Sequence, residues 1–288
     1  MNGILVVNKS KGITSRDVVN SVSKLLHTKK VGHTGTLDPL ATGVLVLTVG
    51  TATKLSEFIT HEYKEYIAEV ILGIKTDTLD ITGNVLEEMN VNIEKNEIVN
   101  IILSMKGKYL QEVPLYSAIK INGKKLYEYA RSGISVELPK REVEIKNINI
   151  IDNIKYENGK VYFKIKCEVS KGTYIRSLIR DIAEKLGVIG VMSNLQRTKV
   201  GDFDIESSYT LQDIENNNFN IISISKYLKF KEVVVDNEND IINGKILDNI
   251  YNEPIIFKNK SNELLAIYKV YEKDNTKIKP WKMLKKVL

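Results

Sequence analysis

Residue types that often carry enzyme chemistry are scarce in this chain. A single cysteine, Cys167, excludes an intramolecular disulfide. Three histidines, His27, His33 and His61, fall with that cysteine into no spacing typical of metal ligands, so we expect no metal. The apolar run 4–7 is too short for an export signal, and no apolar stretch approaches the roughly 20 residues that span a bilayer. We therefore expect a cytoplasmic protein without a membrane segment.

An excess of charge of one sign is also modest. The chain has 42 Lys and Arg against 36 Asp and Glu, a formal net charge of +6. This excess fits a polyanionic partner, although proteins that bind no nucleic acid often have a similar one. With 43% hydrophobic and 27% charged residues, the composition is that of a folded chain, and 288 residues predict two domains.

The hydrophobic pattern predicts strands and helices that do not alternate strictly. Ile4–Val7 predicts a buried strand, and Thr14–Asp17 resembles a capping box that opens a helix. Residues Val161–Val169 alternate apolar and polar side chains like a half-buried strand, which places Cys167 in the core. This order of elements favours the α+β class.

Further helices and strands are marked by their ends. Glu97–Met105 predicts a helix closed by Gly107, and an apolar stripe over 175–186 predicts a helix stopped by Gly187. After residue 230 the chain offers short β-like runs at 233–235, 255–257 and 264–268. We therefore predict a larger domain over 1–229 and a small β domain over 230–288.

Glycine is sparse overall but concentrated in one stretch. Gly32, Gly35, Gly43 and Gly50 fall within twenty residues, three of them before and one directly after the apolar strand predicted at 44–49. Such a density indicates positive φ or close backbone approach, as in loops that carry chemistry. Within it Asp38 precedes Pro39, which favours an extended backbone at Asp38. An Asx turn is the common alternative for such an Asp-Pro pair.

Two other side chains have a functional and an ordinary interpretation. Arg176 lies near a predicted helix N-terminus, where a cation is mildly unfavourable, so a carboxylate partner would explain it. A solvated surface arginine is the equal alternative. Tyr66 begins a predicted strand and is either core packing or a phenol that stacks on a base.

Other enzyme classes lack their residues here. The glycine-rich stretch ends in no Gly-Lys-Ser/Thr and contains no Gly-x-Gly-x-x-Gly, so neither nucleotide fingerprint is met. No Gly-x-Ser-x-Gly elbow supports a serine nucleophile. Asp77 and Asp80 are available to a two-carboxylate glycosidase, but nothing in their spacing fixes such a pair.

Five motifs follow one another in the first 205 residues. They are Gly32–Gly43, Thr76–Thr78 followed by Asp80 and Gly83, Pro114–Lys120, Tyr127–Arg131 and Ser170–Arg176. In this order they resemble the bacterial tRNA pseudouridine synthases of the TruB type, and the resemblance covers most of residues 1–205. One departure is Ser10, where that family usually has proline.

The resemblance implies a pseudouridine synthase fold, with a central mixed, mainly antiparallel sheet flanked by helices and a small C-terminal PUA-like β domain. It implies Asp38 as nucleophile, Arg176 as its ion-pair partner and Tyr66 as stacking residue and base, and it leaves open whether Asp38 attacks the sugar or the uracil ring. A carboxylate nucleophile suffices for a redox-neutral isomerisation, so no cofactor is expected. The implied substrate-binding residues are His33, which fills the space of the flipped nucleotide, Leu195 and Tyr174 at the uracil pocket, and Lys9 and Lys120 at phosphates.

The implied reaction converts uridine 55 in the T-loop of tRNA after base flipping. The expected partner is the T-arm of tRNA, without a guide RNA or an obligate protein partner, and the expected state is a monomer. Two rivals remain. One is a non-catalytic RNA-binding protein with the same fold, and the other is a synthase of the guide-RNA-dependent archaeal and eukaryotic branch. His33 and the absence of an extended basic tail favour the stand-alone type.

Overall fold

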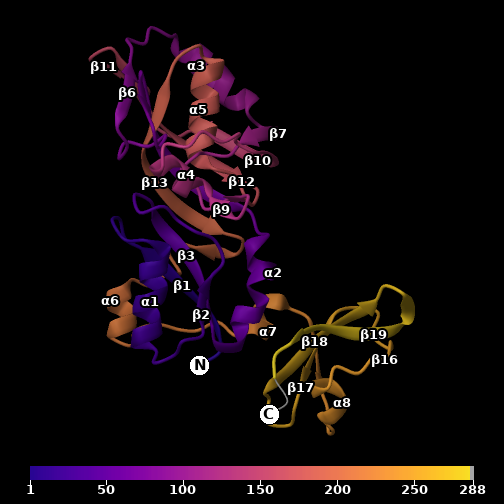
Figure 1. Ribbon diagram of the computed structural model, residues 1–288. Helices are drawn as coiled ribbons and strands as arrows, with labels where there is room; N and C mark the ends of the chain where they lie inside the picture. Colours follow the sequence, from indigo (N-terminus) through magenta and orange to yellow (C-terminus); the bar gives the residue numbers. More distant parts are fainter. Residues whose placement is uncertain (286–288) are drawn as a thin grey trace.

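A computed structural model describes residues 1–285 of the chain (Figure 1). Its centre is a sheet in the order β1-β3-β13-β4-β12-β10-β7. Neighbours along this order are antiparallel except β3 and β13, which are parallel. The mixed, mainly antiparallel sheet expected from the sequence is therefore confirmed. The strands are β1 (Gly3–Lys9), β3 (Thr42–Val49), β13 (Gly190–Val200), β4 (Lys64–Leu72), β12 (Lys160–Val169), β10 (Lys140–Ile150) and β7 (Gly107–Glu112).

Short strands and helices extend this sheet and connect its strands. β2 (Val31–His33), β14 (Phe203–Asp204) and β11 (Lys155–Glu157) pair with β3, β13 and β12. Two separate hairpins pair β5 with β6 and β8 with β9. The connecting elements are the 3₁₀ helix η1 (Gly50–Leu55), α2 (Ser56–Thr60), β5 (Ile74–Thr76), β6 (Val85–Glu88), β8 (Lys120–Ile121), β9 (Lys124–Lys125) and α4 (Leu126–Arg131).

Helices flank the sheet and begin where the sequence signals place them. Helix α1 (Ser15–Leu25) starts with the capping box of Thr14 and Asp17, as predicted. Helix α5 (Ile175–Lys185) buries the predicted apolar stripe and ends before Gly187, whose φ is +70°. Figure 1 shows α5 and α3 together at one end of the sheet, and α1 beside α6 at the other.

One predicted helix end is wrong. Helix α3 (Lys95–Ser104) ends at Ser104, with Met105 as its C-cap. Gly107 does not close it, because this glycine, at φ +113°, is already the first residue of β7. The turn between α3 and β7 is so short that the glycine lies two residues beyond the C-cap of α3 and belongs to the next strand.

The alternating strand near residue 165 is confirmed as the centre of the core. Every second residue of β12 from Val161 to Val169 is buried, and β4 has the same pattern. Cys167 is 1% exposed, and burial raises the pKa of its thiol to about 12. Cys167 lies opposite Tyr66 in the register of β12 and β4, so the two side chains share the buried face of this strand pair.

The C-terminal part forms its own small sheet. Its order is β15-β17-β18-β19-β16, and α8 (Asn239–Ile242) packs on it. The three short strands predicted here are present, whereas β16 and β19 were not expected, because β16 has only two residues and β19 is polar and lysine-rich. The strands are β15 (Lys231–Val234), β16 (Leu247–Asp248), β17 (Ile255–Lys258), β18 (Leu264–Tyr271) and β19 (Asp274–Met283).

An apolar cluster joins the two sheets. The helices α6 (Leu211–Glu215) and α7 (Ile224–Leu228) lead from the central sheet to β15. Ala52 and Leu55 pack with residues of α7, β17 and β18, and Phe58 lies 4.6 Å, centroid to centroid, from Trp281. Figure 1 shows the small sheet, coloured orange to yellow, beside α2 and α7. A division at residue 230 stays a prediction, because this cluster draws on both sides of it.

Within residues 1–285 no helix is both long and apolar enough to cross a membrane. The longest helices have 11 residues and bury one face against the sheet.

The parallel contact between β3 and β13 depends on a glycine. Gly43 lies opposite Arg197 in this register and has a φ of +97°. A Cβ atom at Gly43 would lie 2.2 Å from the carbonyl oxygen of Arg197. Only a residue without a side chain allows the two backbones to approach so closely.

We predict that Gly43→Ala destabilises the protein by about 2 kcal/mol more than Gly107→Ala, because the added methyl group forces the strands apart. Gly107 is the matched control, since it also has a positive φ but nothing within 4 Å of an added Cβ atom. Urea unfolding of both variants measures the difference. Equal losses would show that backbone conformation, and not the contact with β13, sets the requirement at Gly43.

Candidate active site

The loop that carries Asp38 is fixed from both sides. It joins β2 to β3, and Ser15 in α1 both donates to the carbonyl oxygen of Leu37 (3.1 Å) and accepts from its N–H (2.8 Å). The N–H of Gly12 donates to the carbonyl oxygen of Pro39 at 2.8 Å. Asp38 itself keeps 37% of its side chain exposed. The loop therefore holds the carboxylate in place without burying it.

Arg176 is the partner of Asp38. Its Nη2 atom lies 2.9 Å from Oδ2 of Asp38, and its side chain is 6% exposed. The interpretation of Arg176 as a surface arginine is therefore wrong. The pair has one short contact and is not bidentate, because Nη1 donates to the carbonyl oxygen of Thr78 (2.9 Å) and Nη2 also donates to that of Tyr116 (3.1 Å). One guanidinium thus connects three separate segments to α5.

A second carboxylate lies behind Arg176. Oδ2 of Asp80 is 4.0 Å from Nε of Arg176, and Asp80 is 6% exposed. Its other oxygen accepts from the hydroxyl of Thr78 and from the N–H of Thr82, both at 3.0 Å. Asp80 is thus held inside its own turn, while Asp77 accepts from Asn84. These contacts do not form the carboxylate pair that a glycosidase would need.

Asp38 and Arg176 lie at a cavity of about 420 Å³, a volume suited to a small ligand. Tyr66 of β4 and Leu195 of β13, which are 8% and 6% exposed, line it. Tyr174, the N-cap residue of α5, lines it as well. The structure therefore brings together these five predicted site residues. The cavity is completed mainly by Thr34–Leu37, Thr60, Lys64, Tyr116–Ala118, Tyr127, Ser170–Thr173, Ile175 and Arg197.

The prediction that Lys9 contacts a phosphate at the surface is wrong, because Lys9 is 1% exposed. Its Nζ donates to the carbonyl oxygens of Ser10 (2.9 Å), Ile13 (2.7 Å) and Pro39 (3.4 Å). Burial lowers the pKa of Lys9 to about 8, a shift opposed by the nearby charge of Asp38. Lys9 therefore joins the first loop to the loop of Asp38.

His33 and Lys120 lie outside the lining of the cavity. His33 ends β2 and is half-buried, and no described residue forms a hydrogen bond with its buried Nδ1 atom. Burial, with the charges of Arg16 and Arg197, lowers the pKa of His33. Lys120 is exposed on the hairpin of β8 and β9. These two predicted site residues therefore do not line the cavity that contains Asp38.

Two cations that the sequence analysis missed line the cavity. Arg197 is 2% exposed, and Lys64 is 7% exposed. Lys64 donates to the carbonyl oxygens of Thr60 (2.7 Å) and Glu62 (2.6 Å), and burial lowers its pKa to about 8. Lys64 begins β4, whose burial alternates, so its place in phase with the apolar residues Tyr66, Ala68 and Val70 was the available signal. The burial of β13 does not alternate throughout, so Arg197 had no comparable signal. A buried Lys or Arg requires a partner or a function.

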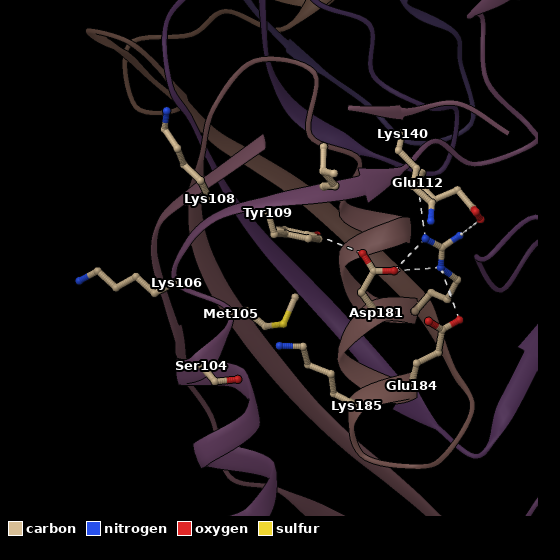
Figure 2. Close-up of a pocket in the computed structure, with 12 residues that line it drawn as sticks. Ser104, Met105, Lys106, Lys108, Tyr109, Glu112, Lys140, Asp181, Glu184 and Lys185 are labelled. Carbon is tan, nitrogen blue, oxygen red and sulfur yellow. Dashed lines mark hydrogen bonds and ion pairs between the residues drawn. The ribbon is translucent and has the colours of Figure 1, made fainter. Parts of the chain in front are cut away.

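Gln111 fixes the backbone at the start of α5. This fully buried residue of β7 accepts from the N–H of Tyr174 (2.8 Å) and donates to its carbonyl oxygen (3.2 Å). It also donates to the phenol of Tyr109. That phenol donates in turn to Asp181 (Figure 2). The side chain of Gln111 thus holds the backbone two residues before Arg176.

A second cavity, of about 520 Å³, lies on the other side of this network (Figure 2). Its central cation, Arg180, is paired with Glu112 at 3.0 Å and with Asp181 at 2.7 Å. Burial raises the pKa of Tyr109 there, and Asp181 adds to the effect. Because its central charged groups already have partners, this cavity is a weaker candidate than the one at Asp38.

Metal-binding groups do not gather in the described part of the chain. Within residues 1–285, no three His, Cys, Asp or Glu side chains lie close enough together to hold a metal ion. Asp38 and Asp80 are instead arranged around the guanidinium of Arg176. The charge available at the site is therefore that of side chains.

Comparison with known families agrees with this geometry. Residues 23–175 match the TruB family pseudouridylate synthase N-terminal domain, which is more than half of the chain. The chain belongs to the TruB family. Residues 176–229 match the tRNA pseudouridylate synthase B C-terminal domain. The protein is thus a pseudouridine synthase, an isomerase, and the sequence resemblance is confirmed.

TruB relatives that match over nearly their whole length support the same assignment, and a solved structure shares the fold. The tRNA pseudouridine synthase B of Staphylococcus saprophyticus is 42% identical over 98% of this chain and 99% of its own length. That of Clostridium tetani is 45% identical over 93% and 92%. A chain in the crystal structure of a Cbf5-Nop10-Gar1 complex shares the fold, with a TM-score of 0.67 and 23% identity over 99% of this chain and 85% of its own.

The structure supports a sharp test of Arg176 in this TruB chain. We predict that Arg176→Lys lowers kcat by about 100-fold or more, because one ammonium cannot replace a guanidinium that reaches Asp38, Thr78 and Tyr116 together. Single-turnover assays measure the rate. Arg180→Lys, the same change one helical turn away and outside the cavity, is the control and retains activity within about threefold. Wild-type rates in Arg176→Lys would contradict the assignment.

Lys9 gives a test of the buried charge beside the catalytic loop. Its pKa is about 8 in the folded protein against an ordinary 10.5, so between these values the unfolded chain binds more protons at this site. The free energy of unfolding of the wild type should therefore rise relative to Lys9→Met as the pH increases from about 8 to about 10. Urea unfolding across this range measures it. Lys11→Met controls for deleting an exposed charge from the same loop, and a difference independent of pH would contradict the burial argument.

Proposed function

We propose that this enzyme isomerises uridine 55 in the T-loop of tRNA to pseudouridine, with Asp38 as the nucleophile. The observation that carries the proposal is the 2.9 Å pair of Asp38 and Arg176 at the edge of a cavity of about 420 Å³. A partly exposed carboxylate with a buried cationic partner is suited to attack a group bound in that cavity. The names of the relatives, tRNA pseudouridine synthase B, support tRNA as the substrate.

The proposed chemistry needs groups that this site contains. The reaction breaks the bond between the ribose C1′ and uracil N1 and forms a bond between C1′ and C5. The proton lost from C5 and the proton gained by N1 balance, so the reaction is redox-neutral and takes no cofactor. Asp38 supplies the nucleophile, and Arg176 orients its carboxylate through the ion pair. Tyr66, across the same cavity, is the proposed base and stacking residue.

Base flipping explains the shape of the cavity. A uridine inside a folded RNA loop is out of reach of Asp38, so it must leave its stack, at a cost of a few kcal/mol, and enter the cavity. The rings of Tyr66 and Tyr174 and the side chain of Leu195 form apolar walls on which a pyrimidine can stack. His33, beside this site on β2, is the proposed group that fills the place of the flipped nucleotide.

Cations around the cavity would bind the phosphates of the T-arm. Lys120, with Lys124 and Lys125 on the same hairpin, extends outward from the motif that holds Tyr116. The C-terminal sheet is the proposed PUA-like RNA-binding domain, which begins at residue 230. We further propose that the enzyme works as a cytoplasmic monomer without a guide RNA or an obligate protein partner.

We predict that Asp38→Asn binds unmodified tRNA within about threefold of the wild type but forms product at least about 1,000-fold more slowly, because an amide cannot act as the nucleophile. Tritium release from tRNA labelled at C5 of uridine measures product, and filter binding measures affinity. Asp202→Asn, the same change at an exposed position outside the cavity, is the control.

Two results would contradict parts of this proposal. Full activity of Asp38→Asn would overturn the mechanism. A wild-type protein that binds tRNA but releases no tritium would favour the rival of a non-catalytic RNA-binding protein. A tRNA transcript with cytidine at position 55 tests the target, because it should bind without tritium release. Release from that transcript would place the reaction at another uridine.

A further inference from the structure

Arg197 is a buried cation that the proposed mechanism does not yet use. It is 2% exposed, and no carboxylate lies within 4.0 Å of its guanidinium in residues 1–285. Burying a charge without an opposite charge costs several kcal/mol unless other groups offset it. A nonpolar side chain of similar size would avoid this cost. The presence of an arginine here therefore indicates a role at the cavity that it lines.

The contacts of Arg197 all lead to the catalytic elements. Nε donates to the carbonyl oxygen of Val44 at 2.7 Å, and Nη2 donates to that of Gly35 at 3.0 Å. Nη1 lies 3.5 Å from the phenol oxygen of Tyr66, and the guanidinium lies 6.0 Å from the centroid of that ring. The first two contacts orient the guanidinium, which leaves Nη1 directed at Tyr66.

The strand register makes this contact a fixed one. Arg197 and Tyr66 lie opposite each other in β13 and β4, so their side chains share one face of the sheet. On its other side Arg197 is opposite Gly43 of β3, at the start of the strand that follows the loop of Asp38. Arg197 therefore lies between the strand that carries Tyr66 and the loop that carries Asp38.

The chemistry of the two groups sets the direction of the phenol proton. A guanidinium has five N–H donors and no acceptor, so the phenol oxygen of Tyr66 must accept from it. The O–H of Tyr66 then cannot point at Arg197, and the contact with the guanidinium fixes where the phenol oxygen lies at the edge of the cavity.

We propose that Arg197 is a positioning residue, which holds the phenol oxygen of Tyr66 in place at the cavity, while its contacts with Val44 and Gly35 orient the guanidinium. Because Tyr66 is the base of the proposed function, this inference rests on that function. It adds a second cationic side chain to a site otherwise described by Asp38, Arg176 and Tyr66.

A double-mutant cycle tests this role. We expect Arg197→Met to lower the single-turnover rate by about 100-fold and Arg197→Lys, which keeps the charge, by about 10-fold, each with tRNA affinity within about threefold of the wild type. In the Tyr66→Phe background, Arg197→Met should lower the remaining rate by less than about threefold. An equal loss in both backgrounds, or a parallel loss of tRNA affinity, would overturn the proposal.

Urea unfolding of the same variants separates this inference from the proposed function. If Arg197 contacts the phenol, the shift of the unfolding midpoint caused by Arg197→Met should fall by at least half when Tyr66 is already Phe. This readout needs no tRNA, so it stays informative if the wild type proves inactive on the chosen RNA. The same midpoint shift in both backgrounds would show that the two side chains do not interact.

Discussion

The site depends on one guanidinium that several separate segments share. Arg176 forms one short ion pair, with Asp38. Its guanidinium also donates to the carbonyl oxygens of Thr78 and Tyr116. These segments follow β2, β5 and β7, which are far apart in the sequence. A buried cation is stable only when its donors are satisfied, so the position of Arg176 constrains all three segments at once.

The rigidity of that arrangement comes from the sheet and from α5. Gln111 binds both backbone polar groups of Tyr174, which fixes the first turn of α5 to β7. On the opposite side, the parallel contact of β3 with β13 fixes the end of the Asp38 loop through Gly43. Nucleophile and partner are therefore attached to different strands of one sheet, and neither depends on a flexible surface loop for its position.

Local sequence signals predicted the elements better than the site. The alternation over 161–169, the capping box at Thr14 and the stop at Gly187 each arise from neighbouring residues, and the structure has all of them. The site depends on contacts between distant segments, which no local pattern encodes. Family motifs therefore found Asp38 and Arg176. Lys9 was misplaced because a lysine is usually exposed, and its burial at the end of β1 depends on the carbonyl oxygens of Ser10, Ile13 and Pro39, which no local pattern reveals.

The local charge of the cavity is more informative than the charge of the chain. A net charge of +6 over 288 residues could not separate an RNA-binding protein from others. The ionisable lining of the cavity, however, comprises the cations Lys64, Lys171, Arg176 and Arg197 against the single carboxylate of Asp38. Because low-dielectric walls strengthen such a field, a polyanion is drawn to the point where the nucleophile is held. In the proposed function, the same excess would stabilise negative charge that develops on a detached uracil, so the groups that attract the RNA would also favour cleavage of its glycosidic bond.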